Sequence, residues 1–390
     1  MEQHSVFSKE EFSRYSRHFI LPEINVAGQE KMKNAKVLVV GAGGLGSPVL
    51  LYLAAAGIGT LGIVDFDTID KTNLQRQVLF STLDEGQPKA VQAKARIQEL
   101  NPHVNVVLHQ VKIDSGNALD IINDYDVIVD GTDNFPTRYL MNDACVLTGK
   151  PLVFGSIFRF EGQLSVFNFK YADGSYSANY RDVFPEPPAP GEVPNCAEGG
   201  VLGVLPGIIG CFQANEVIKI VCGIGEVLAG KMLLLDTLSL LTRTIKIRKQ
   251  PDNPISGENP TIHGLIDYEE FCNIKAPTHQ KEVKVDEIDV FELEKLLSSD
   301  KESFRLIDVR EPYEYEICNL GGELVPLNDI GNWNIDFQGK DRVVVHCRTG
   351  VRSAKAILKL KEKYRDIQFY NLKGGILEWI DRIDGSLVKY

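Results

Sequence analysis

The sequence has no CxxC pair, no apolar run of about 18 residues and no excess of positive charge. Without closely spaced cysteine pairs there is no direct case for zinc, and seven irregularly spaced cysteines make a poor disulfide framework. Without a long apolar run, no membrane-spanning helix is expected. The formal charge of −11 disfavours nonspecific binding to nucleic acid or to an anionic membrane, because both require a cationic surface.

The first 19 residues also lack the apolar core of a signal peptide and carry acidic and basic residues instead, so we expect a cytoplasmic protein. What is present is 390 residues of ordinary globular composition, 44% hydrophobic and 24% charged. Single cores tend to stop growing at roughly 250 to 300 residues. The length therefore predicts two domains.

The chain opens with the pattern of a doubly wound α/β domain. KVLVV at 36–40 predicts a strand, GAGGLG a turn, SPVLLYLAAAGIG a helix and TLGIVDFD a second strand. Four later segments (VNVVLHQV, YDVIVDGTDN, PLVFGSI and GQLSVFNF) also read as strands, and VLPGIIGCFQANEVIKIV reads as a largely buried helix. We predict a Rossmann-like domain over residues 1–250.

A second, smaller α/β domain is predicted over residues 284–390. FRLIDVR, DRVVVHC and IQFYNL are strand-like, and VRSAKAILKLKEKY is helix-like. The segment between the domains, residues 251–283, is rich in Pro, Asn and Gly and is predicted to be a linker.

The glycine turn is the first candidate site. Gly41, Gly43 and Gly46 follow a strand with GxGxxG spacing, which lets backbone amides and a helix N-terminus approach phosphate oxygens. Asp65 ends the next strand, where it can accept hydrogen bonds from ribose hydroxyls. Both features serve NAD and ATP sites equally, so they predict a nucleotide without choosing between the two.

Three charged residues on later loops favour ATP. Arg76 in NLQRQ and Lys89 in QPKA supply cations that a triphosphate needs and a nicotinamide cofactor does not. Asp133 in VDGTDN is a candidate ligand for the Mg²⁺ that accompanies ATP. Each charge taken singly could be a solvated surface residue, but all three are expected at one edge of the sheet.

These motifs carry a family resemblance. RYSRH, GAGGLG, DFD, NLQRQ, GQPKA, DGTDN, EGQLSVF and PNCAEGGVLG, in this order over residues 11–250, resemble the MoeB/ThiF class of adenylyltransferases, relatives of ubiquitin-activating enzymes. The resemblance implies ATP-dependent adenylation of the C-terminal glycine of a ubiquitin-like sulfur-carrier protein. It also implies a homodimer in which Arg17 reaches the phosphates of the neighbouring subunit. Motif by motif, it implies nucleotide contacts from Gly44, Asp65, Asp67, Asn73, Arg76, Gln77 and Lys89, with Asp133 on magnesium and Asn134 beside it.

The sequence departs from this family at the structural zinc. Where many members have two CxxC pairs, this chain has NYRDVFPEPP and NPIS, which place Asn179, Asp182, Asn253 and Ser256 at the four ligand positions. Amide and hydroxyl oxygens are poor substitutes for thiolates in a tetrahedral zinc site. We therefore expect no zinc, with packing or hydrogen bonds in its place.

The second candidate site is the loop CRTGVR, which runs from Cys347 to Arg352. Backbone amides of such a loop, at a helix N-terminus, can hold a thiolate, a persulfide or an oxyanion, and Arg348 and Arg352 strengthen the field. With LIDVRE and NLKGGILEW, the loop completes a resemblance to rhodanese sulfurtransferases over residues 285–388. Phosphatases of similar build usually have a loop one residue longer. The resemblance thus implies a persulfide on Cys347, loaded by a sulfur donor such as a cysteine desulfurase.

Cys196 in VPNCAEGG aligns, by the MoeB/ThiF resemblance, with a family cysteine implicated in a thioester or in resolving a disulfide, and a bystander loop cysteine is the less favoured alternative. Cys211 and Cys222 lie in apolar, helix-like sequence and are expected in the core. Two rival functions stay open, namely a docking protein for sulfur carriers without catalysis and an NAD oxidoreductase with a rhodanese appendage. The sequence also leaves open whether the carrier serves molybdopterin, thiamine or tRNA thiolation.

Overall fold

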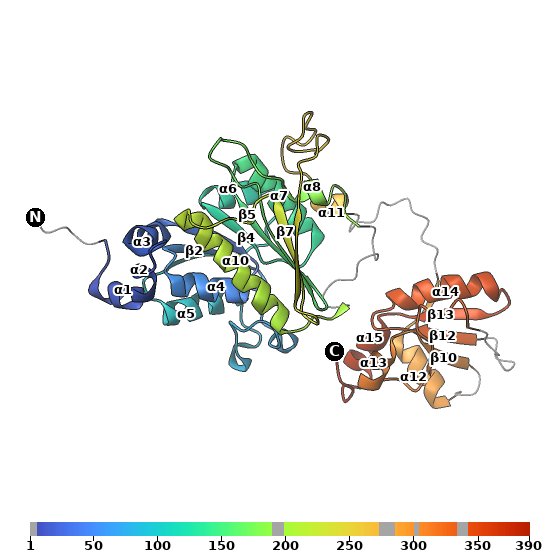
Figure 1. The fold of residues 1–390 in the computed structure, drawn as a ribbon. Coiled ribbons are helices and arrows are strands. Elements are labelled where there is room, and N and C mark those ends of the chain that lie inside the picture. Colours follow the sequence, from blue (N-terminus) through green and yellow to red (C-terminus); the bar gives the residue numbers. More distant parts are fainter. Residues whose placement is uncertain (1–5, 189–198, 273–284, 300–303, 334–341) are drawn as a thin grey trace, which may run out of the picture. The chain divides into compact units, whose positions relative to one another are not determined.

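The computed structural model describes residues 6–188, 199–272, 285–299, 304–333 and 342–390. Contacts divide the chain into two compact units, Met1–Thr278 and His279–Tyr390. Each unit has its own sheet and core (Figure 1).

The first unit is built on an eight-stranded sheet of order β3-β2-β1-β4-β5-β6-β7-β8. The strands from β3 to β5 are parallel, and those from β5 to β8 are antiparallel. The strands are β1 (Lys36–Val40), β2 (Thr60–Val64), β3 (Asn105–His109), β4 (Val127–Asp130), β5 (Leu152–Phe158), β6 (Glu161–Phe167), β7 (Lys231–Asp236) and β8 (Leu241–Lys246). Because β2 and β4 lie on either side of β1, the loops that follow these three strands meet at one edge, as predicted for a nucleotide site.

Helices cover both faces of this sheet, because apolar side chains alternate along its central strands. Val37 and Val39 of β1 pack with α4, α5 and α10, whereas Leu38 and Val40 pack with α6 and α7. Figure 1 shows α4 and α10 side by side. The helices of this unit are α1 (Lys9–Arg14), α2 (Ser16–Phe19), α3 (Asn25–Asn34), α4 (Gly46–Ala56), α5 (Lys89–Leu100), α6 (Ala118–Asn123), α7 (Phe135–Thr148), α8 (Tyr180–Val183), α10 (Val204–Cys222) and α11 (Tyr268–Phe271).

Helix α10 is long and apolar enough to cross a membrane by length and composition alone. In the structure it is a core helix. Ala214 and Val217 lie in the cluster that includes the β1 face, and the helix packs along α4, β5 and β6. The prediction of a helix here is confirmed, although 9 of its 19 residues are buried, fewer than predicted.

The second unit is a five-stranded parallel sheet of order β11-β10-β12-β13-β9. Alternation along β12 again feeds two layers, with Val343 and Val345 facing α14 and Val344 facing α12 and α15. Its elements are β9 (Asp286–Ile288), α12 (Val290–Ser299), β10 (Phe304–Asp308), α13 (Pro312–Ile317), β11 (Glu323–Leu324), β12 (Arg342–His346), α14 (Val351–Lys363), β13 (Gln368–Leu372) and α15 (Gly375–Arg382). The prediction of a second, smaller α/β domain is confirmed.

The linker predicted at 251–283 needs a correction over its first part. Residues 251–272 pack onto the first unit, where Asn253, Ile255, Tyr268 and Cys272 are buried. Tyr268 and Cys272 belong to the same apolar cluster as α6 and α7. Turn-forming composition therefore marks tight turns here, and the side chains between the turns are core residues.

Candidate functional sites

The glycine turn between β1 and α4 brings backbone close to backbone. Gly41 has φ +94°, and a Cβ atom there would lie 2.8 Å from the carbonyl oxygen of Gly131. At Gly46 a Cβ atom would lie 1.9 Å from the carbonyl oxygen of Gly41. Only glycine fits at these two positions, so the turn stays narrow, and the Gly41 amide donates to the Val64 carbonyl oxygen.

A cavity of about 1000 Å³ opens at this turn. Ten of the residues predicted to serve the nucleotide line it: Gly41, Gly43, Gly44, Asp65, Asp67, Arg76, Gln77, Lys89, Asp133 and Asn134. Three other predicted residues do not. Gly46 lies within the turn, where its backbone packs against Gly41. Asn73 lies in a 3₁₀ turn, and its backbone carbonyl oxygen accepts the amides of Arg76 and Gln77. Arg17 is exposed on α2.

Asp65 and Lys89 are held in place by neighbours within the pocket. The Asp65 carboxylate accepts the amides of Ala42 and Asp67, each at 2.8 Å. Burial raises the pKa of Asp65, and these two hydrogen bonds oppose that shift. The buried ammonium of Lys89 donates to Asp67 at 2.9 Å. A carboxylate and a cation thus stand fixed, with little rearrangement needed to meet a ribose and a phosphate.

Asp133 and Asn134 follow β4 on the exposed side of the pocket. Asn134 caps α7, since its side chain accepts the amide of Thr137 at 3.0 Å. Behind them Asp130 is fully buried and accepts both the amide and the hydroxyl of Thr132. These bonds fix the loop that carries Asp133, whose carboxylate is the type of ligand that Mg²⁺ takes.

Sequence reasoning missed three parts of the pocket wall, namely Arg138 and residues 111–116 and 265–269. Arg138 lies 3.9 Å from the buried Asp130 carboxylate. Residues 111–116 directly follow the edge strand β3, which is a signal that could have found them. Residues 265–269 lie in the predicted linker, where an apolar and aromatic pattern (LIDYEEF) is the one available signal.

Hydrogen bonds join the four residues at the family's zinc-ligand positions. Asn179 donates to Ser256 at 2.7 Å, and Asn253 donates to Asp182 at 2.8 Å. The side-chain carbonyl oxygen of Asn253 accepts the amides of Ile255 and Ser256. Asn179 and Asn253 are 1% and 3% exposed. These hydrogen bonds attach residues 253–256 to α8, and the four bonded residues are called the clip below. Hydrogen bonds at these positions, in place of a metal, are what the sequence predicts.

Cys347 lies at the end of β12 and begins the loop that leads into α14. Its sulfur is buried and accepts the amide of Gly350 at 3.1 Å. The hydroxyl of Ser353 lies 3.4 Å from the sulfur and 2.6 Å from Asn371. The loop backbone is also held from outside, because the amide of Ile376 donates to the Cys347 carbonyl. The fold therefore presents one sulfur to a preformed set of donors.

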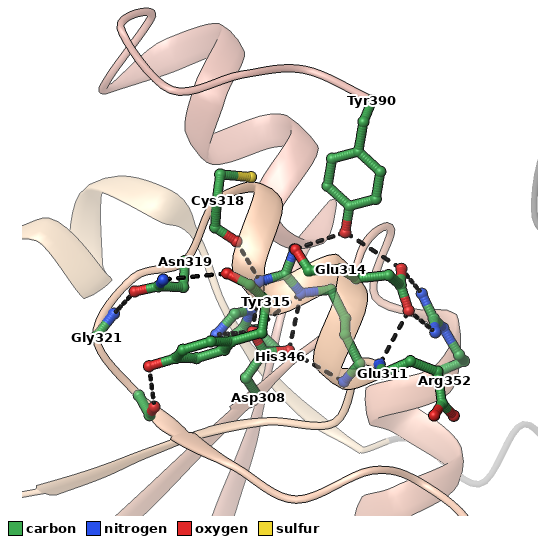
Figure 2. Close-up of polar contacts among 12 residues, drawn as sticks. Asp308, Glu311, Glu314, Tyr315, Cys318, Asn319, Gly321, His346, Arg352 and Tyr390 are labelled. Atoms are coloured by element: carbon green, nitrogen blue, oxygen red, sulfur yellow. Dashed lines mark hydrogen bonds and ion pairs between the residues drawn. The ribbon is translucent and has the colours of Figure 1, made fainter.

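The arginines around this loop have partners within the unit (Figure 2). Arg352 donates to both oxygens of Glu314, at 2.6 and 2.7 Å. The Tyr390 hydroxyl also donates to Glu314, at 3.2 Å, and accepts from the buried Arg310 at 2.5 Å. Arg310 in turn forks onto Asp308. The sequence did not predict the roles of Glu314 and Tyr390, because their spacing gives no sign that they contact Arg352 and Arg310.

His346, directly before Cys347, is fully buried beside Asp308 and Arg310. Its two ring nitrogens have no hydrogen-bond partner among the described residues. Burial lowers the pKa of His346 to about 4, although the Asp308 carboxylate pulls in the opposite direction. The imidazole is therefore neutral at physiological pH.

The sequence also singled out Cys196, Cys211 and Cys222. Cys196 lies outside the described residues, so its role stays a prediction. Cys222 belongs to the core cluster of the first unit, as predicted, whereas Cys211 is only half-buried on α10, so the prediction that it lies in the core is wrong. No group of three or more His, Cys, Asp or Glu side chains that could hold a metal occurs in the part of the chain that the structure describes.

The fold and the two sites define an α/β protein that joins a pocket at a glycine turn to a separate unit with a buried cysteine at the start of a loop. The chain belongs to the ThiF family, whose model matches residues 15–255, and it carries a rhodanese-like domain that matches residues 290–382. ThiF-family adenylation implies the use of ATP.

Known proteins resemble the chain over one or both units. It is 47% identical to the "Probable adenylyltransferase/sulfurtransferase MoeZ" of Mycobacterium tuberculosis, over 100% of this chain and 98% of that protein. It is 51% identical to the "Sulfur carrier protein adenylyltransferase" of Thermus thermophilus, over 69% of this chain and 99% of that one. A crystal structure of E. coli MccB with MccA-N7isoASN aligns with TM-score 0.56 at 24% identity, over 65% of this chain and 76% of that one, and this likeness concerns the fold.

Proposed function

We propose that this protein adenylates the C-terminal glycine of a ubiquitin-like sulfur carrier with ATP and then transfers sulfur to it from a persulfide on Cys347. The observation that carries the proposal is similarity along the whole chain, across both units, to a relative named for both activities. The pocket with Arg76, Lys89 and Asp133 supports the first activity, and the donors around the Cys347 sulfur support the second.

Adenylation requires one anion to attack another. A carboxylate oxygen of the carrier bonds to the α-phosphorus of ATP, the bond to the bridging oxygen breaks, and pyrophosphate leaves. Arg76, Lys89 and the amides of the glycine turn would offset this repulsion by holding the phosphates. A magnesium ion on Asp133 would neutralise further phosphate charge. Arg17 would act on the phosphates of a neighbouring subunit in a homodimer.

Sulfur transfer then consumes the acyl-adenylate. The terminal sulfur of the Cys347 persulfide bonds to the acyl carbon, AMP leaves, and an acyl disulfide remains. A thiolate must then attack the Cys347 sulfur to release the thiocarboxylate, and Cys196 is the candidate. The resulting disulfide would be reduced by a two-electron thiol reductant, and a persulfide donor of the cysteine desulfurase type would reload Cys347. Carrying both sites on one chain raises their effective concentration toward a hydrolysable intermediate.

The direct test is exchange of labelled pyrophosphate into ATP by the full chain, with and without a purified ubiquitin-like carrier that ends in glycine. We expect exchange that depends on the carrier and on its terminal carboxylate. An NAD oxidoreductase would show no exchange and would change nicotinamide fluorescence instead. A docking protein would bind the carrier and show no exchange, which would refute the proposal.

A further inference from the structure

The lining of the nucleotide pocket separates into two chemical groups. One group is the glycine turn with its polar neighbours, since a Cβ atom at Gly43 would lie 3.6 Å from the Gln77 amide and one at Gly44 would lie 3.6 Å from Arg76. The other group comes from residues 111–116 and 265–269, where the aliphatic side chains of Val111, Ile113, Leu265 and Ile266 stand among polar and charged ones. A triphosphate needs the first group, whereas the flat faces of a base suit the second.

Two contacts join these segments into one wall. Lys112 donates to Glu269 at 2.5 Å, and the Ser115 hydroxyl donates to the carbonyl oxygen of Ile266. Both contacts are exposed, so each contributes little free energy alone. Together, however, they hold the backbone of residues 265–269 against the loop that follows β3.

A buried network anchors this wall to the body of the unit. The Tyr268 hydroxyl donates to Asp143 at 2.8 Å, and Arg181 donates to both oxygens of the same carboxylate at 2.8 Å. Tyr268, Asp143 and Arg181 are 4%, 0% and 1% exposed. The Arg181 guanidinium also lies 4.8 Å from the ring centre of Phe271 in the same short helix. Residues 265–269 are thus held by the buried anchor at Tyr268 and, on either side of it, by the loop contacts at Ile266 and Glu269.

We propose that residues 265–269 form the wall against which the nucleotide base packs, and that Tyr268 is the positioning residue that sets this wall. The inference rests on the proposed function, because it assumes that the pocket takes ATP. It assigns base recognition to a segment beyond the strands of the nucleotide fold. The ligand class is a purine nucleoside triphosphate, whose base would pack on Leu265 and Ile266.

The test compares a ligand that has a base with one that lacks it. Tyr268→Phe removes only the hydroxyl that donates to Asp143, and Ser115→Ala removes the contact with Ile266. For both variants of the full chain we expect the Kd for ATP to rise, roughly tenfold for Tyr268→Phe, since the buried hydrogen bond that ties this segment to Asp143 is lost. The Kd for inorganic triphosphate, measured by competition, should stay within twofold.

Tyr315→Phe is the matched control, because it deletes a hydroxyl that donates to the Gly322 carbonyl at 3.0 Å in the second unit. It should change neither Kd. Equal weakening of ATP and triphosphate by the Tyr268 and Ser115 variants would overturn the inference, as would unchanged binding of both ligands. If Tyr268→Phe fails to fold, Ser115→Ala decides alone. Failure of the unmodified protein to bind ATP would instead refute the proposed function.

Discussion

The two candidate sites, one in each unit, hold their charged side chains in different ways. In the first unit, Arg76 and Lys89 line an open cavity of about 1000 Å³ and make single hydrogen bonds, to the Thr72 carbonyl and to Asp67. In the second unit, Arg310 and Arg352 each fork onto a carboxylate, and the Tyr390 hydroxyl joins the two pairs. The first arrangement suits a large ligand with several negative charges. The second suits a site that keeps its shape while one sulfur atom changes chemical state.

The largest expected effect separates the two sites by their chemistry. Cys347→Ala should lower thiocarboxylate formation by about three orders of magnitude or more, because the covalent nucleophile is gone, and should leave pyrophosphate exchange unchanged. Asp133→Ala should reduce both activities, by on the order of a hundredfold or more. Exchange is followed by label in ATP and sulfur transfer by carrier mass. Normal thiocarboxylate formation by Cys347→Ala would remove the proposed role of that residue.

The next effect separates buried from exposed ion pairs. Asp143→Ala leaves the buried Arg181 without its carboxylate, so the free energy of unfolding of the first unit should fall by about 3–5 kcal/mol. Asp381→Ala breaks the exposed pair with Lys389 in the second unit and should cost about 1 kcal/mol or less. Urea unfolding of each full-length variant measures both values. Similar losses for the two variants would contradict the packing described for Asp143.

The free energy of unfolding of the second unit should depend on pH because of His346. Its pKa is about 4 in the folded unit and near 6.5 when exposed, so the unfolded chain binds the proton more readily. The contribution of His346 to stability is therefore present above pH 6.5 and is lost as pH falls toward 4, on the order of 3 kcal/mol. His346→Gln should flatten this part of the curve in urea unfolding between pH 7 and 4. A variant with an unchanged slope would show that other groups cause it.

The smallest effect concerns the hydrogen-bonded clip in the first unit. Asn253→Ala removes two acceptor bonds and two donor bonds and should lower the free energy of unfolding by about 1–3 kcal/mol. Asn105→Ala, at an exposed strand position, should change it by less than about 0.5 kcal/mol. The thermal midpoint of the unmodified protein should not respond to EDTA. A drop on chelation would indicate a bound metal at the clip.

Sequence patterns predicted the elements better than the contacts between them. KVLVV, GAGGLG and TLGIVDFD fix a strand, turn and strand through local geometry, and the pocket around Gly41 and Asp65 follows from that order. Tyr268 was hidden because its partner Asp143 is 125 residues away and the surrounding composition is typical of turns. Glu314 was hidden similarly, since its bond to Arg352 spans 38 residues and depends on how α13 packs. Local spacing carries no information about such pairs.

The clip formed by Asn179, Asp182, Asn253 and Ser256 has a chemical consequence for the proposed activity. A protein that carries a transferable sulfur atom exposes its own thiols to persulfidation and to mixed disulfides. Carboxamide, carboxylate and hydroxyl groups do not react in this way. A fastening made from them is inert toward the cargo, so the adenylating unit would keep its shape even when reactive sulfur accumulates around it.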